Sequence, residues 1–223
     1  MIEEILPPVV AAEEAFADLP EATLFPAEQA AVAQAVAGRR AEFATVRHCA
    51  RAALHRLGMP PAPILPGERR APQWPPGIVG SMTHCTGYRA AALARERDLV
   101  AIGIDAELHG ELPEGVLDLV AVDAERAMLS RLAAEDPKTC WDRLLFSAKE
   151  SIYKAWYPLT GRWLDFADAQ VTFEPAGQRF TTRILVPDMG TAGQRPEFTG
   201  RYLVRNGIVL TAVVVLQDAP ATR

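Results

Sequence analysis

Two acidic side chains stand two positions apart at the end of an apolar run. In the run VAIGIDAE, the alternation of a strand places Asp105 and Glu107 on one face, together with the small residues Ala101 and Gly103. Small residues leave room for a ligand or for an approaching backbone. Two carboxylates at this spacing suit a Mg²⁺ ion that keeps several waters and takes its other ligands from phosphate. The pair alone also fits the exposed end of an ordinary strand.

A second charged pair lies further along the chain. Asp136-Pro137 predicts the start of a long helix that runs to about Tyr157, with Glu150 and Lys154 about one turn apart on it. An exposed pair of this kind stabilises a helix by only about 0.3–0.5 kcal/mol. In a cleft it would supply a third carboxylate and a cation for developing phosphate charge. The position in a cleft is favoured by aromatic residues, because the face that carries the pair also carries Phe146, Tyr153 and Tyr157. The opposite, core face of the helix is predicted to consist of Trp141, Leu144, Leu145, Ala148, Ile152, Ala155 and Trp156.

Two further groups could contact an anion. Thr83 and His84 end the strand-like run IVGSMTH, where a hydroxyl and an imidazole suit phosphate, although a lone histidine is more often structural. A helix predicted over residues 39–58 carries Arg40, Arg47 and Arg51 in one stripe. The stripe fits either an anion site or the solvated flank of a helix.

Composition limits the class of protein. The chain has 223 residues, enough for one large α/β unit or two small packed halves. It is 49% hydrophobic, and its net charge of −5 argues against a nucleic-acid binder that works through general basicity. The longest apolar stretch is about half as long as a membrane helix, so we expect no membrane association. Three widely spaced cysteines predict neither a disulfide framework nor a zinc site, and favour a cytoplasmic location.

The elements that must position these side chains fall into two series. Helices are predicted over residues 27–38 and 39–58, followed by a proline-rich loop over residues 59–77 and by the runs IVGSMTH, RAAALAR and LVAIGIDAE, which resemble an antiparallel meander. The second series has a helix over about residues 123–134, the long helix, and the strand-like runs DAQVTFEP, RFTTRILVP, RPEFTGRYLVRNG and IVLTAVVVLQ. The seam between the series falls near residues 104–112, although no residue-level repeat supports a duplication.

In this order and spacing, the segments SMTH, GIDAE and FSAKESIYK resemble the phosphopantetheinyl transferases of the larger, pseudo-dimeric kind. The similarity looks closest to the bacterial branch that activates siderophore synthetases such as enterobactin synthetase. It extends over about residues 39–166, and it includes the segment RRAEF and the segments YPL and LDF after the long helix. Each motif is short and made of common residue types, but their joint order is highly specific.

The resemblance implies an α+β fold of two similar α/β subdomains, a pseudo-dimer with the active site in the cleft between them. We expect an N-terminal half of residues 1–103 and a C-terminal half of residues 104–223, with neither half working alone. The family transfers the 4′-phosphopantetheine arm of coenzyme A to a serine of an apo acyl or peptidyl carrier protein and releases adenosine 3′,5′-bisphosphate. The resemblance therefore implies coenzyme A as co-substrate, Mg²⁺ as cofactor and carrier proteins as partners of a monomeric enzyme.

The resemblance also implies roles for individual residues. Those that match the magnesium-binding carboxylates are Asp105, Glu107 and Glu150. Those that match groups on coenzyme A are Asp105, Lys154 at the reacting phosphate, Thr83 and His84 on the phosphates, and Arg40, Arg47 and Arg70 at the 3′-phosphate and the adenine end. The neighbours Arg39 and Arg69 leave the register of two of these arginines open. Phe146 stands where many members carry tryptophan, Thr83 replaces a common serine, and arginines replace some lysines. We expect these three departures to affect affinity rather than activity.

The implied reaction is attack of a carrier serine on the β-phosphate of coenzyme A, with catalysis by Glu150, Lys154 and His84. Glu150 or a metal-bound water would take the serine proton, and Lys154 would stabilise the leaving bisphosphate. The segment with Trp156, Tyr157, Arg162 and Trp163 would contact the carrier, although a core position suits Trp156 equally well. Two other classes fit the bare residues, namely a magnesium-dependent nucleotide hydrolase and a non-catalytic nucleotide binder, but binding alone would need fewer carboxylates.

Overall fold

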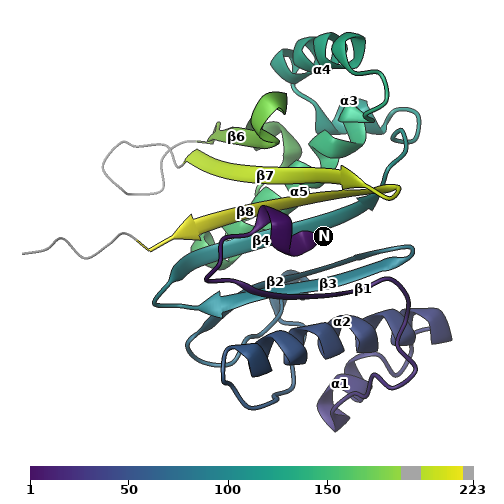
Figure 1. Ribbon diagram of the computed structural model, residues 1–223, viewed down its shortest axis with the longest axis vertical. Helices are drawn as coiled ribbons and strands as arrows, with labels where there is room; N and C mark the ends of the chain where they lie inside the picture. The colour runs from purple at the N-terminus through teal and green to yellow at the C-terminus, as the bar shows by residue number, and fades with distance from the viewer. Residues whose placement is uncertain (187–196, 218–223) are drawn as a thin grey trace, which may run out of the picture.

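The computed structural model describes residues 1–186 and 197–217, which form two antiparallel sheets with helices packed on them (Figure 1). The smaller sheet has the strand order β1-β3-β2 and the larger sheet the order β4-β8-β7-β6-β5. The strands are β1 (Ala11–Ala15), β2 (Ile78–Cys85), β3 (Tyr88–Arg95), β4 (Leu99–Leu108), β5 (Ala169–Glu174), β6 (Arg179–Ile184), β7 (Glu197–Arg205) and β8 (Ile208–Leu216). The α-helices are α1 (Pro26–Ala31), α2 (Ala37–Arg56), α3 (Val116–Val120), α4 (Asp123–Glu135) and α5 (Trp141–Thr160). Short 3₁₀ turns are η1 (Ile2–Ile5), η2 (Glu68–Arg70), η3 (Phe166–Asp168) and η4 (Pro175–Gly177).

The smaller sheet carries α2 on one face. Its central strand β3 is rich in alanine, and these short side chains allow a helix to lie close to the strand. Ala50, Ala53 and Leu54 of α2 are fully buried in this layer. The preceding helix α1 is held to α2 by Glu28, a buried carboxylate whose oxygens each lie 3.1 Å from Arg51.

The larger sheet is covered by α5. All seven residues predicted for the core face of this helix are buried. A buried ion pair joins α5 to α4, because Lys149 Nζ lies 2.8 Å from Glu125 Oε2. At the far end of the sheet, Asn206 and Gly207 connect β7 to β8, and both have the positive φ that a type I′ hairpin turn requires. The hairpin sets the pairing of β7 with β8, and β8 in turn pairs with β4 beneath α5.

The two sheets meet along β2 and β4, which lie side by side (Figure 1). Side chains make the link: the backbone N–H of Ile104 donates to Ser81 Oγ, and that of Ala106 donates to Thr83 Oγ1, each at 3.0 Å. The sequence offset is 23 residues in both bonds, so the two strands run parallel. Behind this junction, residues from both sheets share one core that includes Ala90, Ala92, Ile102, Ile104 and Leu210.

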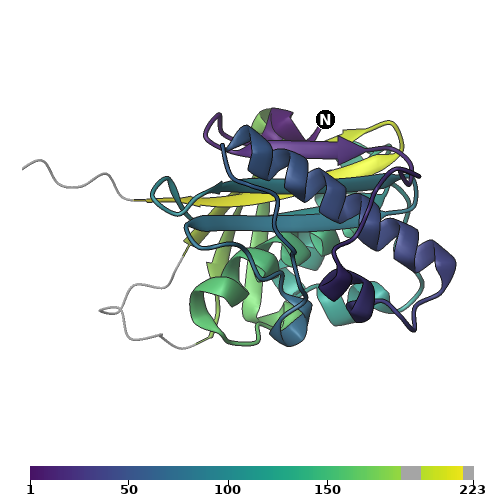
Figure 2. The same ribbon diagram turned by 90° about the horizontal axis from the view of Figure 1, so that it is seen from below.

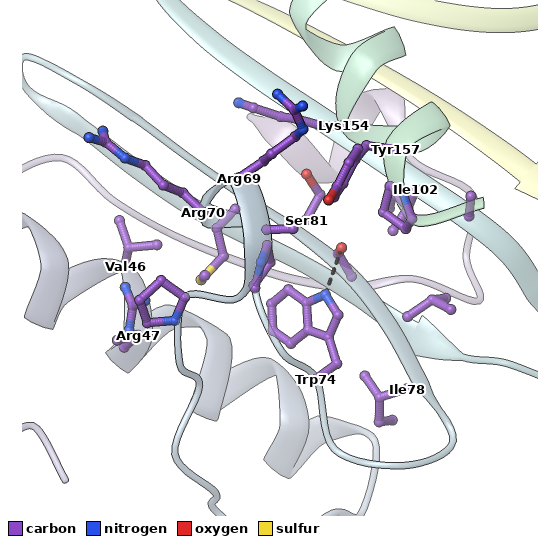
Figure 3. A pocket seen from close by; sticks show the side chains of 18 of the residues that line it. Val46, Arg47, Arg69, Arg70, Trp74, Ile78, Ser81, Ile102, Lys154 and Tyr157 are labelled. Atoms are coloured by element: carbon purple, nitrogen blue, oxygen red, sulfur yellow. Dashed lines mark hydrogen bonds between the residues drawn. The ribbon is translucent and has the colours of Figure 1, made fainter. Parts of the chain in front are cut away.

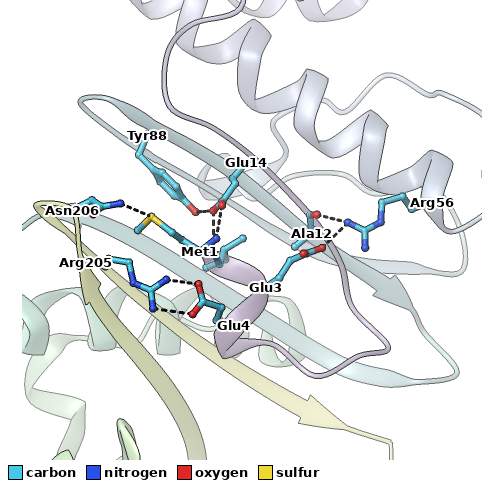
Figure 4. Close-up of polar contacts among 10 residues, drawn as sticks. Met1, Glu3, Glu4, Ala12, Glu14, Arg56, Tyr88, Arg205 and Asn206 are labelled. Carbon is cyan, nitrogen blue, oxygen red and sulfur yellow. Dashed lines mark hydrogen bonds and ion pairs between the residues drawn. The ribbon is translucent and has the colours of Figure 1, made fainter.

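The turn η1 covers the shared core on the face away from α5 (Figure 2). Figure 4 shows how polar contacts hold it to both halves of the chain. Glu4 pairs with Arg205 of β7 at 2.6 Å, and Glu3 pairs with Arg56 of α2 at the same distance. The N-terminal segment therefore connects the two sheets on the side opposite the long helix.

Two sequence expectations about β4 and the long helix need correction, and two elements were not anticipated. β4 does not extend a meander from β3, because the outer edge of β3 is taken by β1 and β4 pairs antiparallel with β8. The long helix starts at Trp141, since Asp136 instead accepts hydrogen bonds from Lys138 and Thr139 in the turn after α4. The strand β1 and the short helix α3 were not anticipated.

The predicted helices over residues 39–58 and 123–134 and the four C-terminal strands are present, with shifted ends. The helix predicted over residues 27–38 is wrong in its second half, because α1 ends at Ala31 and the chain turns before α2 begins at Ala37. The division between residues 103 and 104 falls inside β4, which pairs with β8 along its length. The two halves that form one functional unit remain a prediction. Pro187 and the segment 195–196, at the ends of two predicted strands, lie outside the described residues. Across residues 1–186 and 197–217, no helix is long and apolar enough to cross a membrane.

Candidate active site

A cleft of about 1090 Å³ lies over the junction of β2 and β4, between α2, the proline-rich loop and α5. Arg69, Arg70 and Lys154 lie towards one end, while Trp74 and Ile78 line the other (Figure 3). The indole N–H of Trp74 donates to the carbonyl of Gly80 at 2.9 Å and so holds the loop against β2. The cleft therefore offers a cationic region beside an apolar one, as an elongated ligand with phosphate groups would require.

The floor of the site depends on Gly103. A Cβ atom at this position would lie 1.9 Å from the carbonyl oxygen of Ser151 and 2.7 Å from the backbone nitrogen of Ala155. The backbone of α5 therefore crosses β4 in direct contact, which confirms the expectation that small residues on this face admit a neighbouring backbone. This approach sets Lys154 beside the end of β4.

Asp105 is the centre of the polar group at that end. Its side chain is buried, and its Oδ1 atom lies 2.7 Å from Lys154 Nζ and 3.4 Å from Thr83 Oγ1. Lys154 also donates to the carbonyl of Ile104 at 3.1 Å. The other oxygen, Oδ2, is buried and has no hydrogen-bond partner among the described residues. A buried carboxylate oxygen is costly without a partner, so this atom fits a ligand of a cation.

Glu107 and Glu150 are electrostatically coupled to Asp105. Burial and the charge of Asp105 raise the pKa of Glu150, while Lys154 opposes the shift. Burial and Asp105 also raise the pKa of Glu107, against the effect of Arg143, which lies 3.1 Å from it. Repelling carboxylates with hard oxygen donors fit a divalent cation such as Mg²⁺. In the described part of the chain, however, no three His, Cys, Asp or Glu side chains already form a metal-binding group.

His84 lies at the wall of the cleft, in contact with an arginine that sequence reasoning did not assign. Its Nε2 atom is 2.6 Å from a terminal nitrogen of Arg39. Glu42 lies near both, since its Oε2 atom is 3.3 Å from Arg39 and 3.9 Å from His84 Nδ1. Burial and the charge of Arg39 lower the pKa of His84. The hydroxyl of the neighbouring Thr83 is directed to β4 and Asp105, and its contact with a phosphate stays a prediction.

The predicted arginines divide into three groups. Arg70 lines the cleft, whereas Arg40 is exposed and is absent from the lining that the described residues form. The preceding residue Arg39 takes that place, because neighbours on a helix point about 100° apart. Arg47 also lines the cleft but is buried, donates to the carbonyl of Ile64 at 2.8 Å and stacks on Phe43. Burial lowers the pKa of Arg47 to about 10, so the side chain keeps its charge at neutral pH.

Arg51, the third member of the predicted stripe, has a structural role instead. It is paired with Glu28, which also lies 3.8 Å from Arg47. Arg51 therefore fits neither predicted alternative, because its side chain is only 13% exposed and its charge is paired with a buried carboxylate of the protein itself.

The aromatic residues after Lys154 differ in exposure. Trp163 has 57% of its surface exposed, and Arg69 stacks over its ring at 5.2 Å. Trp156 is buried at 1% exposure, so the core alternative is the correct one for it. Sequence reasoning missed Glu42 and Arg143, whereas it left Arg39 and Arg69 open as alternatives to their neighbours Arg40 and Arg70.

Two family models match most of the chain. The model described as the 4′-phosphopantetheinyl transferase N-terminal domain matches residues 27–94. The model described as the 4′-phosphopantetheinyl transferase superfamily matches residues 101–203. The gap between the two matches, residues 95–100, covers the end of β3, the turn to β4 and the start of β4.

Curated proteins show the same similarity over nearly the whole chain. The 4′-phosphopantetheinyl transferase Svp of Streptomyces mobaraensis is 54% identical over 98% of this chain and 91% of its own length. The 4′-phosphopantetheinyl transferase PptT of Mycobacterium tuberculosis is 48% identical over 96% of this chain and 98% of its own. Enterobactin synthase component D of Salmonella typhimurium is 31% identical over 83% and 76%. The branch that the motifs suggested is thus a more distant relative than Svp or PptT.

Proposed function

The chain belongs to the 4′-phosphopantetheinyl transferase superfamily, and on this premise we propose that its cleft binds coenzyme A with the pyrophosphate near Lys154. It is a 4′-phosphopantetheinyl transferase, which moves the 4′-phosphopantetheine arm of coenzyme A to a serine of an apo carrier protein. The other product is adenosine 3′,5′-bisphosphate. One observation supports the location of the reacting site above the others: Lys154 Nζ lies 2.7 Å from the buried Asp105 at the cationic end of the cleft.

The cationic side chains around the cleft suit the phosphate groups of coenzyme A. Arg39, Arg70 and His84 line the same cavity as Lys154. We assign Arg39 rather than Arg40 to the phosphates, since Arg40 is exposed beside the cleft. Planar guanidinium groups bind phosphate through paired hydrogen bonds, so two arginines can orient the ligand as well as attract it.

The transfer step needs a proton acceptor and a cation. The serine oxygen forms a bond to the β-phosphorus while the bond from that phosphorus to the leaving bisphosphate breaks. Glu150, which lines the cleft about one helical turn before Lys154, would accept the proton of the serine hydroxyl. Lys154, oriented by Asp105 and the carbonyl of Ile104, stabilises negative charge on the leaving phosphate.

Asp105, Glu107 and Glu150 are the residues that would hold Mg²⁺. The unpartnered Oδ2 of Asp105 and the raised pKa values of both glutamates are consistent with a divalent cation among them. When bound, Mg²⁺ neutralises charge on the pyrophosphate. Without it, Arg143 already provides one counter-charge to Glu107.

The carrier protein would approach the exposed side of the segment after Lys154. Trp163 is exposed there, and Tyr157 and Arg162 lie nearby in the sequence. The chain itself carries a net charge of −5, so attraction for an acidic carrier must come from such local groups. We propose that the enzyme acts as a monomer in the cytoplasm, where all three cysteines stay reduced, on carriers of polyketide, peptide, siderophore or fatty-acid synthesis.

Intact-mass analysis of apo carrier domains tests these assignments. With coenzyme A and Mg²⁺, the wild-type enzyme should add one phosphopantetheine group to the carrier, and chelation of the metal should stop the reaction. Asp105→Ala, Glu150→Ala and Lys154→Ala should each abolish the added mass while circular dichroism stays native. Lys138→Ala, at an exposed lysine, is the matched control. Full turnover by the Glu150 variant would remove its assigned role, and bisphosphate release without a carrier would indicate a hydrolase.

A further inference from the structure

The contact between Arg39 and His84 fixes the protonation of the imidazole ring. A guanidinium group has only donors, so the Nε2 atom that lies 2.6 Å from Arg39 must accept a hydrogen bond. An accepting ring nitrogen carries no proton, and the proton of the neutral ring is therefore on Nδ1. Nδ1 faces the Oε2 atom of Glu42 at 3.9 Å. The ring is thus neutral, and the nitrogen that carries its proton lies within ion-pair distance of a carboxylate.

The charges around His84 come from three elements. Arg39 of α2, Lys154 of α5 and Arg89 of β3 all disfavour a charged ring, as does burial. Glu42 opposes them. Arg89 is itself held by Asp18 at 2.8 Å, and its other end lies 3.5 Å from Glu42. Glu42 is therefore the acidic group through which both arginines and the ring are connected.

We propose that Glu42 is a positioning residue for His84, which holds the Nδ1–H tautomer in the free protein and stabilises a second proton that His84 gains when coenzyme A binds. This inference rests on the proposed function of the cleft. A phosphate oxygen of the ligand takes over the hydrogen bond from Arg39. Nε2 then takes up one proton from solvent and keeps it, and the new N–H donates a hydrogen bond to the phosphate. One proton is taken up and no covalent bond other than this N–H changes.

Electrostatics gives the direction of this change. In the complex the phosphate charge offsets Arg39, and the ring then lies between two anions, the phosphate and Glu42. Both favour the charged imidazole, so the pKa of His84 rises on binding. By linkage, a group whose pKa rises on binding makes the complex take up protons at a pH between its two pKa values.

Calorimetry measures the proton directly. Coenzyme A is titrated into the protein at about pH 7.5, above the ordinary pKa of histidine, in buffers of different ionisation enthalpy and without metal. The slope of the heat against that enthalpy gives the protons taken up. We expect the wild type to take up at least about half a proton more per bound coenzyme A than His84→Asn does. In Glu42→Gln most of this additional proton uptake should be lost. Glu42→Asp should recover part of it, and Glu21→Gln, at an exposed loop position, should match the wild type.

The tautomer is tested separately by long-range ¹H–¹⁵N NMR of the free protein, with His84→Asn to assign the signal. The wild type should show the proton on Nδ1, and Glu42→Gln should shift the ring towards a mixture of tautomers. An Nε2–H tautomer in the wild type overturns the inference even where Glu42→Gln fails to fold. Equal proton uptake in wild type and His84→Asn, or in wild type and Glu42→Gln, also overturns it. If carriers are modified while no proton is taken up, the proposed function stands alone; if coenzyme A gives no binding heat, the proposed function fails as well.

Discussion

At the scale of single residues, the site is organised around Asp105. One of its oxygens accepts from Lys154 and Thr83, and the other has no hydrogen-bond partner within residues 1–186 and 197–217. Thr83 serves two elements with one hydroxyl, because the same Oγ1 atom accepts from the backbone of Ala106 at 3.0 Å. The side chain that orients the carboxylate is therefore also one that joins β2 to β4.

Thr83→Val tests this double role. The variant keeps the shape of the side chain but leaves the N–H of Ala106 without its acceptor, at an expected cost of about 1–3 kcal/mol in the free energy of unfolding. Turnover should fall by about 10–100-fold, because Asp105 loses a hydrogen bond that orients it. Thr83→Ser retains the hydroxyl and should restore both quantities. Urea denaturation and carrier-modification kinetics give the two measurements, and an unchanged rate in the valine variant would contradict the orienting role.

At the scale of elements, the closeness of α5 to β4 decides where the charged pair of the helix lies. Gly103 permits backbone contact with Ser151 and Ala155. On the opposite side, the Lys149–Glu125 ion pair holds α5 to α4. The helix is thus fixed from both sides, and Glu150 and Lys154 project towards the cleft from a rigid element.

Gly103→Ala should disturb this packing. Its Cβ would overlap the carbonyl of Ser151, which belongs to the backbone of a buried helix and has little freedom to move. We expect a loss of about 1–3 kcal/mol in stability and a larger proportional loss of turnover, because α5 carries Glu150 and Lys154. Gly110→Ala is the control, since a Cβ there meets no atom within 4 Å. Denaturation curves and kcat of the two variants make the comparison, and equal effects would refute the argument.

At the scale of the whole molecule, the two sheets depend on one another. The core behind the β2–β4 junction takes residues from both, and η1 covers it with contacts to α2 and β7 (Figure 4). Since neither sheet can bury this surface alone, we expect the chain to unfold in one cooperative transition.

Two local probes can test this cooperativity. In a Trp74→Phe variant, fluorescence reports the C-terminal part through Trp141, Trp156 and Trp163. Labelling of the buried thiol of Cys49, on α2, reports the N-terminal part. The urea midpoints of the two signals should coincide. Separate midpoints would show that the halves fold independently, and would support the division of the chain near residue 103 into autonomous units.

The sequence alone determined the candidate carboxylates, the lysine and the elements that carry them. Strand alternation placed Asp105 and Glu107 on one face, and helical periodicity separated the core face of α5 from the face with Glu150 and Lys154. These inferences held because each concerns the direction of neighbouring side chains on one element, which backbone geometry fixes. The joint order of the motifs then indicated the family.

Tertiary structure decided what joins these elements and which neighbours share the site. β4 pairs with β8 and not with β3. Pairing between strands that are distant in sequence depends on which strand edges are free, and local periodicity does not show this. Nor could the sequence distinguish Arg39 from Arg40, because the packing of α2 decides which of these two neighbouring side chains lines the cleft. Two contacts arise only where distant segments meet, namely Lys154 with Asp105 and Glu42 with His84. Both depend on the packing of α5 and α2, which line the same cleft over the β2–β4 junction.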